Sequence, residues 1–398
     1  MHAFSPGRIG GLEIKNRFVR AATSETMADE DGAVTQHLVE LHRSLAAGGV
    51  GLSILGHAFV HPRGQSLPNQ TGIHDDTMIP GLAQLTGAVH EAGGKIFAQL
   101  AHAGNQGGMG GVAMLAPSAV PNALTSSAVE PAQENEMEEV IAAFGSAASR
   151  AMAAGFDGIH IHAANGYLLS SFGSPHSNTR KDHWGGDAAR RSRLLTLVYQ
   201  SVRDAVGTDV PVTAKVGMVD QVDDGLKIKE SVGRVRNLAE IGLDAVEVSV
   251  GLMSSGADSC HQHVAVDRRQ ALADLLYHRL LRPPGQEAYF EPFARAVRKA
   301  IPELKVLLVG GLRTTETIER VLNDGSCDFV CLARPLIREP DLIAQIEAGR
   351  RGRLDCTSCN LCLENEGHHH LQCWRTPRVR LLHAAAMHLR RRLRAINH

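Results

Sequence analysis

Net charge, long apolar runs and a leader segment are what this sequence lacks, and each absence excludes a class of protein. The formal net charge is −1 and the isoelectric point is near 7.1, so the overall charge favours neither a nucleic acid nor an anionic membrane as a partner. No apolar run approaches the ~20 residues that cross a bilayer. The opening MHAFSPGRIGG has neither the basic segment nor the apolar run of a signal peptide. We therefore expect a cytoplasmic protein.

Aromatic residues are also scarce, at 4% of the chain, and the seven cysteines are an odd number. Four of these cysteines crowd into Cys356–Cys373. In a chain without a signal peptide, this crowding favours metal or redox chemistry in a reducing compartment over disulfides. Glycine, in contrast, is abundant, with 40 residues among 398, which suits the many turns of an alternating α/β fold. The length is normal for an α/β barrel with insertions.

Eight short apolar or β-branched runs alternate with amphipathic segments along the chain. The predicted strands are Phe18–Ala22, Gly51–Gly56, Lys95–Leu100, Gly158–His162, Val212–Val216, Ala245–Val250, Lys305–Val309 and Phe329–Leu332. The predicted helical segments include Glu136–Ala153, Arg190–Val206, Lys229–Ile241, Pro292–Ala300 and Thr314–Leu322. This alternation favours a (β/α)8 TIM barrel over a doubly wound sheet, because no G-x-G-x-x-G follows the first strand. We expect the barrel at residues 1–350 and a Cys-rich, basic extension at 351–398.

In a TIM barrel the chemistry lies at the carboxyl ends of the strands. Polar and cationic residues collect there in this sequence, although each one taken alone could be a helix cap or a solvated side chain. The strand-end candidates are Thr23, Glu25, Gly56, His57, Gln99, His102, His162, Asn165, Tyr167, Lys215, Ser249, Gly310, Gly311 and Arg334. The last three follow the seventh and eighth strands, where barrels commonly bind phosphate. Glycine lets backbone N–H groups approach an anion, and arginine adds charge-assisted hydrogen bonds.

Two long insertions also follow strands at this predicted face. Residues 103–131 are rich in Gly, Pro, Ser and Ala, and residues 252–286 contain His261 and His263. We expect both insertions to overhang the site as loops or lids. The two histidines are interpreted as ordinary loop residues rather than as metal ligands.

The stretch from Gly155 to Arg193 carries the densest chemistry. A buried strand ends there and delivers His162, Asn165 and Tyr167 within six residues. Imidazole and carboxamide groups are costly to bury without partners. All three side chains can donate a hydrogen bond to one ligand oxygen, and a phenol can also give up a proton. The alternative is a polar strand end whose side chains are satisfied locally.

This stretch resembles the signature of the old yellow enzyme family of FMN-dependent oxidoreductases, in particular the branch with bacterial 2,4-dienoyl-CoA reductase and trimethylamine dehydrogenase. One departure is that the family usually follows Gly185-Gly186 with Ser-x-Glu-Asn-Arg, where this chain has Asp187-Ala-Ala-Arg-Arg. The resemblance extends over roughly residues 1–345. The matching motifs are His162-Ala-Ala-Asn165-Gly-Tyr167-Leu-Leu, Ser174-Pro175, Asn178, Arg180, Asp182, Gly185-Gly186, Phe4-Ser5-Pro6, Lys15-Asn16-Arg17, Ala22-Thr23-Ser24-Glu25 and Gln99-Leu100 with His102.

The resemblance implies an FMN ring lying across the barrel mouth and assigns residues to its parts. It implies that residues near the pyrimidine edge are Ala22, Thr23, Gly56 and Gln99. It implies that Lys215 lies near N1 and O2, where a cation stabilises the anionic reduced flavin. It implies that the phosphate is bound around Gly310, Gly311, Ala333 and Arg334.

The implied activity is a ping-pong reduction in which NADH or NADPH reduces FMN and an activated alkene is then reduced. His162 and Asn165 would hold the substrate carbonyl oxygen, and Tyr167 would donate a proton to the α carbon. A rival within the family is an oxidative amine dehydrogenase or demethylase with an electron-transfer partner. A rival of another class is a non-catalytic barrel that binds flavin or another phosphate ligand.

The extension contains Cys356, Cys359, Cys362 and Cys373 in a C-x2-C-x2-C-x10-C pattern. Such spacing suits a [4Fe–4S] cluster, with zinc and free thiols as alternatives. The dienoyl-CoA reductase branch carries a similar run that binds such a cluster. Beyond it, the basic and leucine-bearing residues 375–394 could form a docking helix or a solvated tail. The expected partners are a small-molecule substrate, an electron-transfer protein if the cluster is present, and a second copy of the chain in a homo-oligomer.

Overall fold

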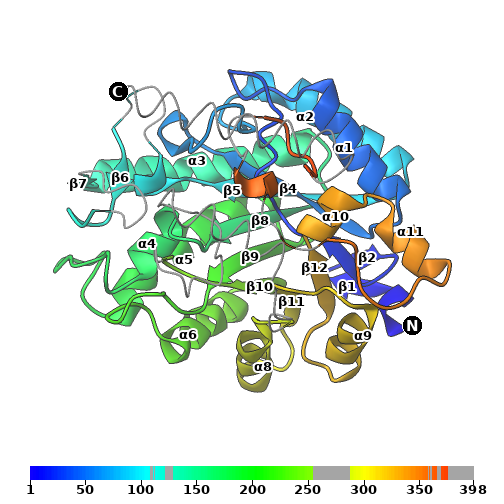
Figure 1. Ribbon diagram of the computed structural model, residues 1–398. Helices are drawn as coiled ribbons and strands as arrows, with labels where there is room; N and C mark the ends of the chain where they lie inside the picture. Colours follow the sequence, from blue (N-terminus) through cyan, green and yellow to red (C-terminus); the bar gives the residue numbers. More distant parts are fainter. Residues whose placement is uncertain are drawn as a thin grey trace, which may run out of the picture.

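The computed structural model describes residues 1–107, 111, 113–121, 129–253, 287–356, 358, 361–364 and 369–374. Within these residues, eight parallel strands close into a barrel, and helices surround it (Figure 1). The barrel strands are β3 (Phe18–Arg20), β4 (Leu52–Phe59), β5 (Lys95–Ala101), β8 (Gly158–Ala163), β9 (Val212–Gly217), β10 (Ala245–Ser249), β11 (Lys305–Val309) and β12 (Phe329–Leu332). The prediction of a (β/α)8 TIM barrel is therefore confirmed, and each strand overlaps its predicted range, although β4 continues past Gly56 to Phe59.

Helices connect successive strands on the outside of the barrel. The long ones are α1 (Gln36–Ala47), α2 (Ile79–Glu91), α3 (Glu134–Ala153), α5 (Ala188–Val206), α6 (Ile228–Glu240), α8 (Glu291–Ala300) and α9 (Thr315–Asn323). The shorter ones are α4 (Leu168–Gly173), α10 (Arg334–Arg338), α11 (Leu342–Glu347) and α12 (Leu361–Glu364), with 3-10 turns at His2–Phe4, Pro62–Gly64, Asp76–Met78 and Gly104–Gln106. In the part of the chain that the structure describes, none of these helices has the length and apolarity to span a bilayer.

The core has two layers because side chains alternate across each strand. Outward-facing strand residues pack against the helices, and inward-facing ones form a second cluster inside the barrel. A hairpin of β1 (Gly7–Ile9) and β2 (Leu12–Ile14) adds Ile9 and Ile14 to this inner cluster. Both contact residues near the strand starts, such as Phe97 and Phe329, so the hairpin closes the amino end of the barrel.

The first predicted insertion lies at the opposite end, after β5. The first contains a small sheet of β6 (Leu115–Ala116) and β7 (Glu130–Pro131). Most of the second, including His261 and His263, lies outside the described residues, as do residues 375–394 of the basic tail. The division into a barrel at 1–350 and an extension at 351–398 remains a prediction.

Candidate active site

Four neighbouring strands bring the predicted polar residues side by side inside the barrel. In the register of the sheet, Gln99 on β5 pairs with His160 on β8, and His162 on β8 pairs with Lys215 on β9. Lys215 in turn pairs with Glu247 on β10. Because the strands are parallel, these side chains share the carboxyl half of the barrel, as predicted from the sequence.

A buried network of charge lies beneath the barrel mouth. Lys215 Nζ is 3.0 Å from one oxygen of Glu247, and His160 Nε2 is 3.2 Å from the other. Burial opposes ionisation of Glu247, but Lys215 and His160 outweigh it and lower the pKa of this carboxyl to about 2. Burial lowers the pKa of His160, whose Nδ1 contacts Thr213 Oγ1 at 2.7 Å. The network therefore holds one anion and one cation around a neutral imidazole.

The turn after β8 sets the positions of Asn165 and Tyr167. Asn165 has φ +59° and Gly166 has φ +76°, so two successive left-handed residues reverse the chain into α4. Two hydrogen bonds to its backbone hold the turn: Asn165 N donates to Val250 O at 2.9 Å, and the side-chain Gln106 Nε2 donates to Asn165 O at 2.8 Å. The Asn165 amide also reaches Ser249 Oγ at 3.5 Å. This geometry is what places Tyr167 beside the strand end.

His162 and Tyr167 are direct neighbours. Their ring centroids are 4.8 Å apart at 66°, and the ring of His57 stacks on His162 at 6.3 Å. Burial and then the charge of Lys215 lower the pKa of His162 well below its ordinary value, so the imidazole is neutral. Within the described residues, His162 Nδ1 is buried without a hydrogen-bond partner. A neutral imidazole with such a nitrogen can form a hydrogen bond with a ligand atom.

Tyr167 also contacts two residues from β4 and the loop after it. Its hydroxyl lies 3.2 Å from His57 Nε2 and 3.3 Å from Ser66 Oγ. His57 is one of the strand-end candidates, whereas Ser66 and its neighbour Gln70 were missed. Their loop has no periodic pattern that distinguishes them from solvated residues.

The residues assigned to the flavin pyrimidine edge lie around the ends of β3, β4 and β5. Thr23 Oγ1 donates to Ala21 O at 3.1 Å, next to Ala22. A Cβ at Gly56 would lie 1.9 Å from both Thr23 O and a Glu25 carboxylate oxygen, so only glycine lets this loop cross β4. Gln99 is buried, and its Nε2 has no partner among the described residues.

The predicted phosphate site contains an additional arginine. Gly310 and Gly311 have φ +112° and +74°, and a Cβ at either would lie 2.7 Å from the Tyr289 ring, so both positions require glycine. Arg313 follows this pair and is buried, and its Nε makes no hydrogen bond to the described residues. Burial and then the nearby charge of Arg334 lower the pKa of Arg313. Two guanidinium groups that repel each other form a natural site for a phosphate dianion.

Ala333 connects the phosphate site to the barrel. It packs against the inner cluster between Cys331 on β12 and Arg334 at the start of α10. Arg313 comes directly after Gly310-Gly311-Leu312 in the sequence, within the segment that predicts the phosphate site.

The donor set fits flavin mononucleotide. Among the described residues, Gln99 on β5, His162 on β8 and Arg313 after β11 each have a buried nitrogen without a hydrogen-bond partner. Lys215 provides a cation, and the arginine pair provides charge for a phosphate. A ring system with several polar edge atoms and a dianionic tail would satisfy all of them.

The cysteine segment packs against the β3 side of this barrel end. Leu371 N donates to Glu25 O at 3.2 Å, and Thr26 Oγ1 donates to His369 O at 3.1 Å. Cys373 Sγ is 3.8 Å from the guanidinium of Arg338.

Three of the four predicted metal ligands can be placed in the structure. They are Cys356, Cys362 and Cys373, whereas Cys359 lies outside the described residues. Over the described ranges, no three His, Cys, Asp or Glu side chains converge in a way that would hold a metal ion. The predicted metal site therefore stays a prediction.

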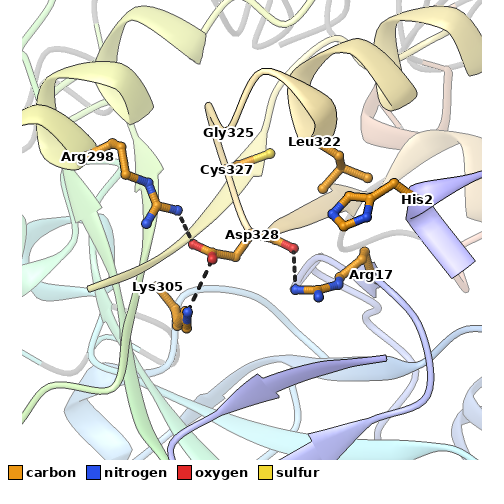
Figure 2. A pocket seen from close by; sticks show the side chains of 8 residues that line it. All are labelled: His2, Arg17, Arg298, Lys305, Leu322, Gly325, Cys327 and Asp328. Atoms are coloured by element: carbon orange, nitrogen blue, oxygen red, sulfur yellow. Dashed lines mark hydrogen bonds and ion pairs between the residues drawn. The ribbon is translucent and has the colours of Figure 1, made fainter. Parts of the chain in front are cut away.

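A separate hollow of about 430 Å³ lies at the other end of the barrel, away from this chemistry (Figure 2). Asp328 occupies it and binds Arg298 and, at 3.4 Å, Lys305, while Arg17 donates to Asp328 O. Asp328 also accepts from Val306 N at 2.8 Å. Because these cationic groups already pair with Asp328, the hollow is structural and links β11 and β12 to the first strand.

Comparisons with known proteins agree with this geometry. Residues 2–352 match the family model described as the NADH:flavin oxidoreductase / NADH oxidase family. The chain is 34% identical to an NADH oxidase of Thermoanaerobacter brockii, over 90% of this chain and 52% of that protein, so it spans about half of that relative. It is 35% identical to a 4,4'-dithiodibutanoate disulfide reductase of Rhodococcus erythropolis, over 90% of this chain and 92% of that protein.

Two further comparisons support the same assignment. The chain is 35% identical to an NADPH dehydrogenase of Geobacillus thermodenitrificans, over 85% of this chain and 91% of that protein. Its fold superimposes on a 2-naphthoyl-CoA reductase complex with a TM-score of 0.83 and 25% identity, over 95% of this chain and 57% of that one. The resemblance to the old yellow enzyme family is confirmed, and the chain belongs to the NADH:flavin oxidoreductase / NADH oxidase family of flavin-dependent oxidoreductases.

Proposed function

We propose that this chain is an FMN-dependent reductase that takes electrons from NADH or NADPH and reduces activated C=C bonds, such as those of α,β-unsaturated carbonyl or enoyl-type compounds. The observation that carries the proposal is the contact of Tyr167 with neutral His162 at the barrel mouth, where His162 pairs with Lys215 in the register of β8 and β9. This arrangement combines a proton donor, a carbonyl-binding group and a cation at one place.

A bound flavin supplies the hydride, and the chain provides the rest of the chemistry. His162 and Asn165 hold the substrate carbonyl oxygen and draw electron density from the conjugated double bond. Lys215 stabilises negative charge on the reduced ring, and Arg313 and Arg334 hold the phosphate. Tyr167 delivers the proton that completes the reduction, because a phenol keeps its hydrogen at neutral pH.

Disulfide reduction is a second candidate, favoured by the Rhodococcus relative that the chain covers almost completely. In that reaction the hydride goes to one sulfur and Tyr167 protonates the departing thiolate. The site geometry serves both substrates because each needs a hydride and a proton on neighbouring atoms. Oxidation of an amine would need an electron acceptor in place of the nicotinamide.

We also propose a [4Fe–4S] cluster on Cys356, Cys359, Cys362 and Cys373. The thiols follow the spacing of a cluster-binding run, and the segment packs against the Glu25 loop. Iron, sulfide and zinc analysis of anaerobically purified protein tests this. About four irons per chain would support the cluster. One zinc per chain would show a zinc site instead, and no metal with titratable thiols would show free cysteines.

The deciding experiment for the main proposal separates the two half-reactions of the purified protein. In anaerobic stopped-flow, NADPH or NADH should bleach flavin absorbance near ~450 nm, and an enone should restore it. The same reduced protein is mixed with an organic disulfide as the second candidate's test. If only the disulfide restores the flavin absorbance, disulfide reduction replaces alkene reduction as the proposed function. If the protein takes up no FMN, both proposals are wrong.

The Tyr167→Phe variant tests the role of Tyr167 as the proton donor. We expect reduction by the nicotinamide to stay within about twofold while alkene reduction slows by about 10²-fold or more, because general acid catalysis by one group contributes that much. Equal loss in both half-reactions would show that Tyr167 supports the site without donating a proton.

A further inference from the structure

A closed ring of hydrogen bonds surrounds the Tyr167 hydroxyl. Tyr167 Oη lies 3.2 Å from His57 Nε2, and His57 Nδ1 lies 2.7 Å from Gln70 Nε2. Gln70 Oε1 lies 3.1 Å from Ser66 Oγ, which returns to Tyr167 Oη at 3.3 Å. His57 and Gln70 are buried, and Ser66 is half-buried. The direction of each bond in this ring can be deduced.

Two backbone groups of known polarity fix the Gln70 amide. Ser66 N–H can only donate, and it lies 2.7 Å from Gln70 Oε1. His57 O can only accept, and it lies 2.7 Å from Gln70 Nε2. The amide oxygen therefore faces Ser66 and the amide nitrogen faces His57, and a flipped amide would lose both bonds.

The orientation of Gln70 fixes the tautomer of His57. Since the Gln70 nitrogen donates, His57 Nδ1 must accept, and the hydrogen of the neutral ring is on Nε2. Burial lowers the pKa of His57 and keeps the ring neutral, because it outweighs the opposing effects of the His57 backbone and of the Glu25 charge. His57 Nε2–H then points to the oxygen of Tyr167, so Tyr167 accepts this bond.

Tyr167 donates its own hydrogen elsewhere. Ser66 uses its own hydrogen on Gln70 Oε1, so it presents a lone pair to Tyr167. Within the ring the phenol hydrogen therefore points to Ser66 or, when one is present, to a ligand. Around the ring, His57 therefore donates to Tyr167, Tyr167 to Ser66, Ser66 to Gln70, and Gln70 back to His57.

We propose that His57, fixed as its Nε2–H tautomer by Gln70, is a positioning residue that makes Tyr167 a one-way proton donor. In the reductive reaction the Tyr167 O–H bond breaks, a C–H bond forms at the substrate α carbon, and the electron pair stays on the phenolate. His57 Nε2–H stabilises that phenolate by a charge-assisted hydrogen bond. Water returns the proton through the half-buried Ser66. This role rests on the proposed alkene reduction, whereas the tautomer does not.

The tautomer is tested by ring-15N NMR of histidine-labelled protein, with His57 identified by the signals missing in His57→Gln. We expect one protonated nitrogen, Nε2, and one unprotonated acceptor, Nδ1, between pH 6 and pH 9. Gln70→Met removes the hydrogen bond that His57 Nδ1 accepts, so the Nδ1 signal of His57 should shift. His61→Gln is the control, because it changes a different histidine after the same strand and should leave the His57 signals in place. A hydrogen on Nδ1, or a doubly protonated ring, would overturn the proposal.

The positioning role is tested in the two half-reactions of the FMN-loaded protein. His57→Leu should slow alkene reduction by about 10²-fold with nicotinamide-driven flavin reduction within about twofold, because only the former needs the proton. His57→Gln, whose amide can donate from nearly the same place, should recover most of this loss. Equal slowing of both half-reactions, or no recovery in His57→Gln, would reduce His57 to a packing role.

The test of the His57 tautomer and the test of the proposed function can fail independently of each other. If wild-type protein reduces no alkene, the proposed function fails, and the ring-nitrogen signals alone then decide the direction of the His57–Tyr167 bond. Should His57→Leu misfold, as judged by circular dichroism and FMN uptake, Gln70→Met serves in its place. We expect it to slow alkene reduction less than His57→Leu does, because His57 can still populate the Nε2–H tautomer; loss equal in both half-reactions would again contradict the proposal.

Discussion

Among single residues, Arg313 is the most specific sign of a phosphate ligand. Burial and then the charge of a second arginine, Arg334, lower the pKa of Arg313, and the nearby Glu287 offsets this only in part. Such an arrangement costs stability unless an anion is bound. A phosphate dianion between the two would convert this repulsion into binding energy.

Arg313→Gln should therefore weaken FMN binding by about 10- to 100-fold, since a hydrogen bond to a charged group contributes about 1.5–3 kcal/mol. Quenching of flavin fluorescence measures the dissociation constant. Riboflavin, which lacks the phosphate, is the control ligand and should bind the variant and the wild type alike. A similar loss for riboflavin would place Arg313 outside the phosphate site.

Glu247 was not identified from the sequence, although it shares a strand face with Ser249. It places a negative charge 3.0 Å from the cation assigned to the reduced flavin. Its charge offsets part of that of Lys215 and so weakens the field of this cation at the ring. The isosteric Glu247→Gln removes the offset and should stabilise the anionic reduced flavin.

We expect Glu247→Gln to raise the flavin midpoint potential, by roughly 30 mV for each 1.4 kcal/mol of added stabilisation in a two-electron couple. Anaerobic dye-equilibration titration measures it. Thr213→Val, which removes the hydroxyl beside His160 without changing charge, is the control and should leave the potential unchanged. A lower potential in Glu247→Gln would mean that Lys215 loses its proton together with its partner.

At the scale of elements, the strands were predictable and the loops only in part. A barrel strand is buried on both faces, so each one appears as a short apolar run between turn residues. The polar residue after such a run must lie at the carboxyl end, which is how His162, Lys215 and Gly310 were found. Ser66 and Gln70 lie ten and fourteen residues beyond Gly56, the predicted end of β4, in a loop whose path depends on tertiary contacts.

The β1–β2 hairpin was not predicted either, because its three-residue strands are too short for a pattern. Ile14→Ala in this hairpin should destabilise the protein by about 2–5 kcal/mol, the usual cost of a cavity in a packed core. Urea unfolding followed by circular dichroism measures the change, with the exposed Glu13→Ala as control. FMN affinity should not change, since the hairpin closes the opposite end; a large loss of affinity would mean that the two barrel ends are coupled.

For the molecule as a whole, the barrel buries an unusual set of neutral histidines. Burial lowers the pKa of His57, His160 and His162, and it lowers that of His102 to about 3. His102 Nδ1 accepts from Gly104 N at 3.1 Å, a bond that a protonated ring could not accept. In the unfolded chain each of these rings has an ordinary pKa near 6.5.

These shifts determine how stability changes with pH. Below about pH 6.5 the unfolded chain takes up protons that the folded chain refuses, so acid favours unfolding, by up to about 1.4 kcal/mol per pH unit for each histidine. For His102 this loss continues until its folded pKa of about 3. Glu247 adds a loss of the same sign only between its ordinary value near 4.5 and its folded value of about 2.

We therefore expect the free energy of unfolding to fall steadily as the pH drops below 6.5. Carboxylates alone would begin to lower it only about two pH units further down. Urea midpoints measured at half-unit steps from pH 8 to pH 4 test this. His102→Asn, whose amide oxygen can replace Nδ1 as the acceptor from Gly104 N, should give a shallower slope than the wild type, because it has no proton to refuse. A flat profile down to pH 5 would show that the buried rings are already protonated in the folded barrel.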